Sequence, residues 1–163
     1  MSDDPSQLLR FAVHEAAHAV AAVRLGFRCS RVTVEADRQR CEFSFPRLAH
    51  AMGRLWRGRR ITVALAGYAA IVLRFGPESD EVAKAEAGDD LEYAEKLIRA
   101  PWQDADAQLD AWTGWVRGFV GVTANQRAIE LVAGELLART TMPGSDVKSI
   151  VEAMGARRAL TCP

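Results

Sequence analysis

The sequence predicts a mainly α-helical protein of the α+β type with one small β-hairpin, folded as a single domain over residues 1–163. Apolar residues recur at helical spacing through most of the chain, and only one pair of short segments alternates apolar with polar residues. With 49% hydrophobic residues, a chain of this length can bury one sizeable core. We therefore expect helices that surround this core, with a single hairpin beside them.

The first helix and the hairpin are expected in the N-terminal third of the chain. Asp4 is a capping residue and Pro5 suits the first helical turn, so a helix should begin there, and Gly26 is well placed to end it. The segments RVTVE (31–35) and CEFSF (41–45) each alternate apolar with polar residues. The polar residues between them predict a turn, so the two segments are expected to pair as short strands.

Helical patterns dominate the rest of the chain. The segment ITVALAGYAAIVLRFG, residues 61–76, is apolar on nearly every side, which predicts a central buried helix. Proline and glycine separate the segments that follow it. Helices are expected at residues 47–56, 61–76, 88–99, 104–120, 124–140 and 145–154.

Charge and composition argue against several classes of function. Lysine plus arginine and aspartate plus glutamate both number 21, so the net charge of zero gives no support for nucleic acid or an anionic membrane as a partner. The N-terminus is acidic where a signal peptide needs positive charge, and no apolar run reaches membrane-spanning length. We expect a cytoplasmic protein with reduced thiols, although Cys29 and Cys41 flank the hairpin and could approach each other.

One almost wholly apolar stretch, FAVHEAAHAVAAV at residues 11–23, contains His14, Glu15 and His18. At 3.6 residues per turn, the two histidines project from one helix face, where both imidazoles can bind a single metal ion. Glu15 lies close enough to act as a base without being a ligand. This HExxH pattern predicts zinc-dependent hydrolysis, because zinc lowers the pKa of a bound water that attacks a carbonyl. The alternative is a pair of hydrogen-bonded core histidines beside a glutamate that reaches solvent.

A catalytic zinc site needs a third protein ligand, and helical periodicity favours Asp90. The inward face of the helix expected from Asp89 onward is set by Leu91, Ala94, Leu97 and Ile98. Asp90 shares this face, whereas Asp89 is expected on the wet side with Tyr93. The alternative for Asp90 is an ordinary first-turn aspartate attracted by the helix dipole, a role that suits Asp89 better. The remaining histidine, His50, is expected at the surface or at a helix cap.

Four segments follow one another along the chain: HEAAHAVAA, RVTVE, ITVALAGYAAIVLRFG and AGDDLEYAEKLI. In this order and at these separations they resemble the peptidase domain of the FtsH-type ATP-dependent zinc metalloproteases, and the similarity continues into NQRAIELVAGELLARTTMPGSDVKSIV. The family's third zinc ligand is an aspartate directly before leucine or isoleucine at a helix start, which Asp90 matches. The resemblance implies a helical peptidase domain that holds Zn²⁺ with His14, His18 and Asp90, and the family's ring assemblies favour a homo-oligomer.

The chain also departs from the family pattern. Ala17 replaces a glycine, Asp89 replaces an asparagine, and Ile71 and Val72 stand where the family has glutamates. The sequence contains no GxxxxGK[ST] phosphate loop and no membrane-spanning segment, so we expect no ATP-binding module and no membrane anchor. The substrates are then expected to be peptides or proteins that are already unfolded, unless a partner protein supplies the unfolding.

The sequence thus predicts a zinc metallopeptidase in which Glu15 is the general base. The strand formed by Cys41, Glu42, Phe43, Ser44 and Phe45 is expected to bind an extended substrate by strand addition. Equally, this hairpin could serve only to cover the core. Tyr68 has the chemistry to stabilise an oxyanion, or it packs inside the buried helix. The alternative function is an inactive zinc-binding pseudoprotease that acts as an adaptor or assembly module, which Ile71 favours and Glu15 opposes.

Overall fold

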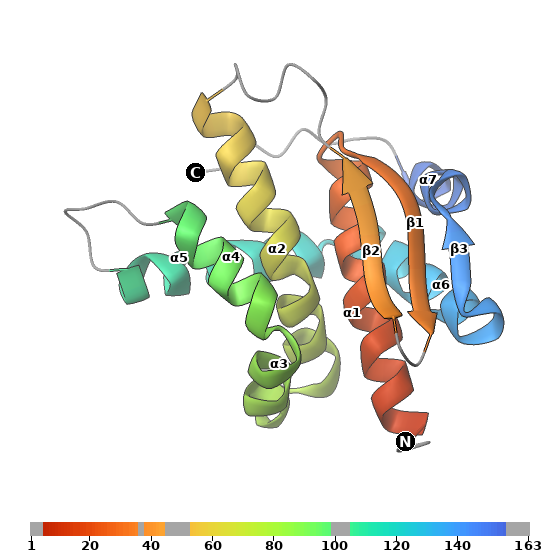
Figure 1. The fold of residues 1–163 in the computed structure, drawn as a ribbon, viewed down its shortest axis with the longest axis horizontal. Coiled ribbons are helices and arrows are strands. Elements are labelled where there is room, and N and C mark those ends of the chain that lie inside the picture. The colour runs from red at the N-terminus through yellow and green to blue at the C-terminus, as the bar shows by residue number, and fades with distance from the viewer. Residues whose placement is uncertain (1–4, 36–37, 45–52, 99–104, 156–163) are drawn as a thin grey trace.

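The computed structural model describes residues 5–35, 38–44, 53–98 and 105–155. They form a mainly helical domain with one small three-stranded antiparallel sheet, which confirms the predicted fold class (Figure 1). The sheet covers one side of helix α1 (Pro5–Arg24), and helix α2 (Gly53–Phe75) packs against another. Within the described part of the chain, no helix combines the length and the apolarity that crossing a membrane requires.

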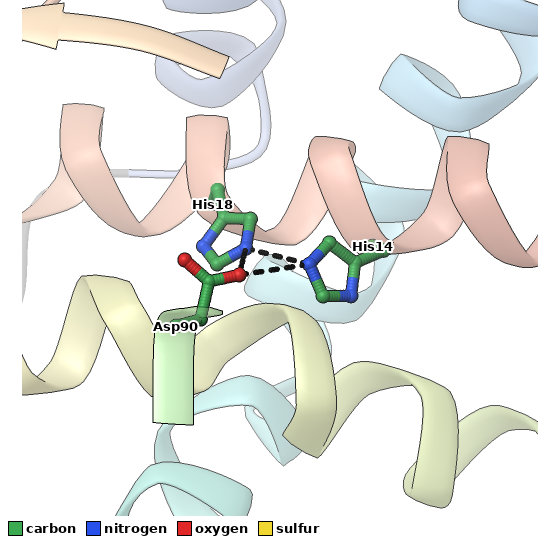
Figure 2. Close-up of side chains that lie close together, drawn as sticks. All are labelled: His14, His18 and Asp90. Carbon is green, nitrogen blue, oxygen red and sulfur yellow. Dashed lines mark hydrogen bonds and ion pairs between the residues drawn. The ribbon is translucent and has the colours of Figure 1, made fainter. Parts of the chain in front are cut away.

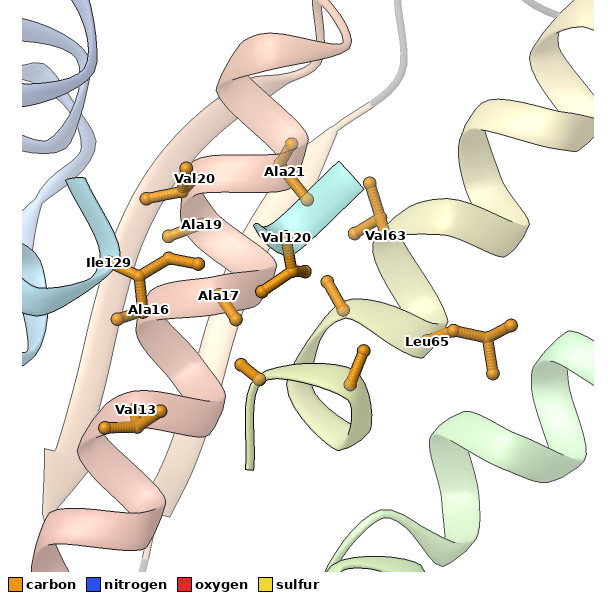
Figure 3. Packing of buried hydrophobic residues seen from close by; sticks show 14 of the residues in the cluster. Val13, Ala16, Ala17, Ala19, Val20, Ala21, Val63, Leu65, Val120 and Ile129 are labelled. Atoms are coloured by element: carbon orange, nitrogen blue, oxygen red, sulfur yellow. The ribbon is translucent and has the colours of Figure 1, made fainter. Parts of the chain in front are cut away.

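Helix α1 lies at the centre of the molecule. Its residues from Ala12 to Ala22 are all buried, and most of them are alanine or valine, whose small side chains let neighbouring helices approach closely. Figure 3 shows these side chains facing Val63 of α2, Val120 and Ile129. As predicted, the helix ends before Gly26, which has a φ of 86° that favours glycine.

The predicted hairpin forms between β1 (Arg28–Glu35) and β2 (Arg38–Ser44). A third strand, β3 (Thr141–Pro143), pairs with the other edge of β1, so the order is β2-β1-β3 and β2 is an edge strand. The sequence prediction had a loop at β3, which is too short to show alternation. Next to it, Gly144 contacts β1 so closely that a Cβ atom there would lie 2.0 Å from the Cys29 carbonyl oxygen.

The remaining helices surround α1 and α2. They are α3 (Asp80–Glu86), α4 (Gly88–Ile98), α5 (Ala105–Gly121), α6 (Thr123–Arg139) and α7 (Gly144–Ala153), with a short 3₁₀ helix η2 (Pro77–Ser79) before α3. Two predictions were wrong here: α2 is one continuous helix from Gly53, and η2 and α3 were not expected. Residues 47–52, 99 and 104 of the expected helices lie outside the described residues.

The two cysteines of the hairpin are close but not joined. Cys29 on β1 and Cys41 on β2 are free thiols connected by a side-chain hydrogen bond. The two thiols do approach each other, as the hairpin pattern allowed. Cys162 lies outside the described residues.

Candidate metal centre and its cleft

The three predicted ligands lie together in the structure. His14 and His18 stand one turn apart on α1, and Asp90 reaches them from the first turn of α4 (Figure 2). The Asp90 Oδ2 atom lies 3.1 Å from His14 Nε2 and 3.0 Å from His18 Nε2, and the two Nε2 atoms are 2.9 Å apart. Three potential ligand atoms therefore converge on one point from positions up to 76 residues apart in the sequence.

The orientation of His18 is fixed from behind by α2. Its Nδ1 atom lies 2.7 Å from the backbone carbonyl oxygen of Val63, and this nitrogen must donate because a carbonyl oxygen only accepts. In the neutral imidazole, the lone pair is then on Nε2 and faces the cluster. A hydrogen bond behind a ligating nitrogen is a common feature of metal-binding histidines.

His14 is positioned by packing. A Cβ atom on Gly67 of α2 would lie 2.6 Å from the His14 ring, so the ring occupies space that any other residue at position 67 would fill. The Nδ1 atom of His14 is buried and has no hydrogen-bond partner among the described residues. Close contact with Gly67 therefore takes the place of a hydrogen bond in orienting this imidazole.

The electrostatics of the cluster call for a positive charge at its centre. Burial alone lowers the pKa of His18, but Asp90 and Glu15 outweigh it and raise this pKa to about 9. Burial would raise the pKa of Asp90, yet His18 and His14 together hold it well below its ordinary value. Without a shared proton or a cation, three acceptor atoms would face one another at about 3 Å. Two imidazole nitrogens and a carboxylate oxygen are a donor set that suits catalytic Zn²⁺.

Glu15 lies at the same site without joining the cluster. Glu15 is only 7% exposed, so the alternative sequence interpretation, in which this glutamate reaches solvent, is wrong. Burial raises the pKa of its carboxyl, and His18 and His14 oppose this shift only in part. The carboxylate also accepts a hydrogen bond from the backbone N–H of Cys41, which ties it to strand β2. Glu15 is therefore held between the His14–His18–Asp90 cluster and strand β2.

A cleft of about 580 Å³ opens over this site. Helices α1, α2, α3 and α4 and the edge strand β2 contribute its walls, and His14, His18, Glu15 and Asp90 all line it. The acidic side chains of Glu86 and Asp89 also line the cleft, so its charge is mainly negative. A pocket with this lining suits a polar ligand with a cation at its base.

The predicted substrate strand lies beside the cleft, and only part of it contributes side chains. Cys41 and Phe43 line the cavity. Glu42 instead forms an ion pair with Arg31 at 2.8 Å, and Ser44 is exposed. Phe45, like His50, lies outside the described residues.

Two cleft features were missed or misjudged from the sequence. Tyr93, placed on the wet side by periodicity, lines the cleft, and its hydroxyl accepts a hydrogen bond from Arg60. Tyr93 stands three residues after Asp90, and this helical spacing is the signal that could have placed it beside Asp90 in the cleft. Tyr68, the residue considered for an oxyanion, bonds Asp80 of α3 and is not part of the cleft lining.

Comparison with protein-family models finds no match, and no curated protein matches the chain.

Proposed function

We propose that this protein is a zinc-dependent metallopeptidase that hydrolyses peptide bonds, with His14, His18 and Asp90 as zinc ligands and Glu15 as general base. The proposal rests on one observation above all: the HExxH residues of α1 and the distant Asp90 converge at the base of a cleft. Glu15 lies beside them, buried but not part of the cluster. This arrangement provides three protein ligands and a separate carboxylate, as hydrolytic zinc sites require.

The reaction divides between the metal and the chain's own residues. When bound, Zn²⁺ supplies a Lewis acid that makes water acidic near neutral pH and polarises a carbonyl group. Glu15 takes the proton from the attacking water and returns it to the leaving amine. Burial raises the Glu15 pKa from its ordinary value, which brings the carboxyl closer to the pH at which a group can both accept and release a proton. Val63 and Gly67 keep both imidazoles in position.

The edge strand β2 favours a peptide as the substrate. An edge strand has backbone N–H and C=O groups without partners on its outer side, and an extended peptide can pair with them. Cys41 and Phe43 of β2 line the cleft that contains the metal cluster. A peptide added to this edge would therefore pass over the metal centre, which explains why an extended chain suits this site better than a compact small molecule.

The Glu15→Gln variant separates an active peptidase from the zinc-binding pseudoprotease. We expect a loss of peptide hydrolysis of about 100-fold or more with unchanged zinc content, since glutamine cannot accept the proton and Glu15 is not a ligand. Turnover is measured with a library of quenched fluorescent peptides that have no stable fold, and zinc content is measured by elemental analysis.

Glu152→Gln on the exposed face of α7 is the matched control, and it should hydrolyse peptides like the wild type. Hydrolysis that survives Glu15→Gln would disprove the mechanism. If the zinc-loaded wild type hydrolyses no peptide, the adaptor function is favoured.

A further inference from the structure

The chain has two tyrosines, and their surroundings are alike except for one difference. Arg117 lies over the ring of Tyr68, and Arg60 lies over the ring of Tyr93, with guanidinium carbons 5.9 and 5.2 Å from the ring centres. Tyr68 donates its hydroxyl hydrogen to Asp80. Tyr93 has no such acceptor among the described residues and lines the cleft above the metal cluster. The two hydroxyls therefore differ in their acceptors: Tyr68 donates its hydrogen bond to Asp80, whereas Tyr93 faces the cleft.

Hydrogen-bond accounting leaves the Tyr93 O–H available to a ligand. Arg60 Nε donates to the hydroxyl oxygen at 2.8 Å, and Arg60 Nη2 donates to the same oxygen. A guanidinium has no acceptor, so the phenolic hydrogen cannot go to Arg60. Two bonds from a positive group also draw electron density from the oxygen, which makes the O–H a stronger donor.

The position of this hydroxyl follows from two helices. Tyr93 stands three residues after Asp90 on α4, and Arg60 stands three residues before Val63, whose carbonyl holds His18, on α2. Residues at this spacing share a helix face with their Cβ atoms about 5–6 Å apart. Both helices thus place the Arg60–Tyr93 pair about one turn from the three candidate ligands, and Tyr93 lines the same cleft.

We propose that Tyr93 donates a hydrogen bond to the carbonyl oxygen of the peptide bond being cleaved, and to the negative oxygen that develops there as water attacks. This inference rests on the proposed function, because it assigns the oxyanion donor of the same site. No covalent bond to Tyr93 forms, and its proton stays on the phenol throughout. A fixed hydrogen-bond donor aimed at developing negative charge contributes strongly to catalysis.

The test compares Tyr93→Phe with Tyr68→Phe in the full, zinc-loaded chain. Each change removes one hydroxyl and leaves the ring beneath its arginine. The probes are two peptides of the same sequence: a phosphinic peptide, whose anionic oxygens resemble the tetrahedral state, and a mercaptoacyl peptide, which binds the metal through sulfur. We expect Tyr93→Phe to lower the binding affinity for the phosphinic peptide, measured by calorimetry, by about 10- to 100-fold. The affinity for the mercaptoacyl peptide should change by less than about threefold.

Tyr68→Phe should leave both affinities and the zinc content at wild-type values. Equal affinity of the wild type and Tyr93→Phe for the phosphinic peptide would overturn the inference, as would loss of zinc from Tyr93→Phe or failure of the wild type to bind this peptide. The proposed function fails separately. If the phosphinic peptide binds through Tyr93 and no peptide is hydrolysed, only the peptidase proposal is contradicted.

Discussion

Gly67 and His14 share a small volume between α1 and α2, and this contact explains why a glycine stands inside an otherwise apolar helix. Glycine within a helix costs about 1 kcal/mol relative to alanine. Here the missing side chain gives the His14 ring its place, since a Cβ atom would lie 2.6 Å from it. The glycine therefore serves the site more than the stability of α2.

Replacing Gly67 with alanine should impair metal binding more than folding. The added methyl group must push the His14 ring out of the cluster or separate α1 from α2. We expect zinc affinity to fall by about tenfold or more with helical content unchanged, measured by competition with a chromophoric chelator and by circular dichroism. Gly134→Ala is the matched control, because this helical glycine of α6 has open space around it. Equal zinc affinity of Gly67→Ala and the wild type would refute this account of His14.

At this scale the sequence was informative where a residue's role depends on spacing within one helix. The spacing of His14 and His18 and the inward register of Asp90, together with the family resemblance, predicted that the three would meet, and they do. Tyr93 was assigned to the wet side because periodicity shows only which residues lie near the core. A cleft between helices gives polar residues a further environment, which depends on how the helices pack.

Among the elements, η2 and α3 are anchored by one carboxylate. Asp80 accepts the hydroxyl of Tyr68 from α2, lies 2.7 Å from Lys84 Nζ, and is 3.9 Å from Arg117 on α5. Lys84 and Tyr68 lower the pKa of Asp80 from its ordinary value of 3.8. This network connects α3 to α2 and α5.

The anchor predicts a pH-dependent effect of Asp80→Asn. A carboxyl with a lowered pKa in the folded state stabilises the fold above its unfolded pKa of 3.8, and this contribution disappears as the pH falls through the lower folded value. We expect the variant to melt about 1–3 °C below the wild type at pH 7, with the gap closing in acid. Asp110→Asn, an exposed change on α5, controls for the loss of one charge. A gap that stays constant in acid contradicts the ionic anchor.

The elements that were predicted correctly are those long enough to show a period. Helices α1, α4, α5, α6 and α7 and the hairpin all follow their apolar patterns. Strand β3 has three residues and α3 has seven, so neither repeats its pattern often enough to be recognised. Two separate helices, residues 47–56 and 61–76, were expected where α2 is continuous, and Gly58 lies between them. Gly58 is buried within α2, where packing outweighs its low helix propensity.

In the whole molecule, the candidate site is built on the most buried element. Helix α1 packs against α2, α6, α7 and the sheet, so His14, Glu15 and His18 are held by the core itself. Asp90 comes from α4, which packs on α2. A metal ion bound by all three ligands would therefore link the two parts of the fold that form opposite walls of the cleft.

The central claim is that His14, His18 and Asp90 hold one zinc ion, and the most direct measurement is the metal content of the purified chain. Elemental analysis should find close to one zinc per chain in the wild type after purification without chelators, and little in His14→Ala and Asp90→Ala. Asp89→Ala changes the neighbouring aspartate, which lines the cleft outside the cluster, and should keep its zinc. A wild type that retains no zinc even after the metal is added back, or an Asp90→Ala variant that binds it fully, would contradict the account.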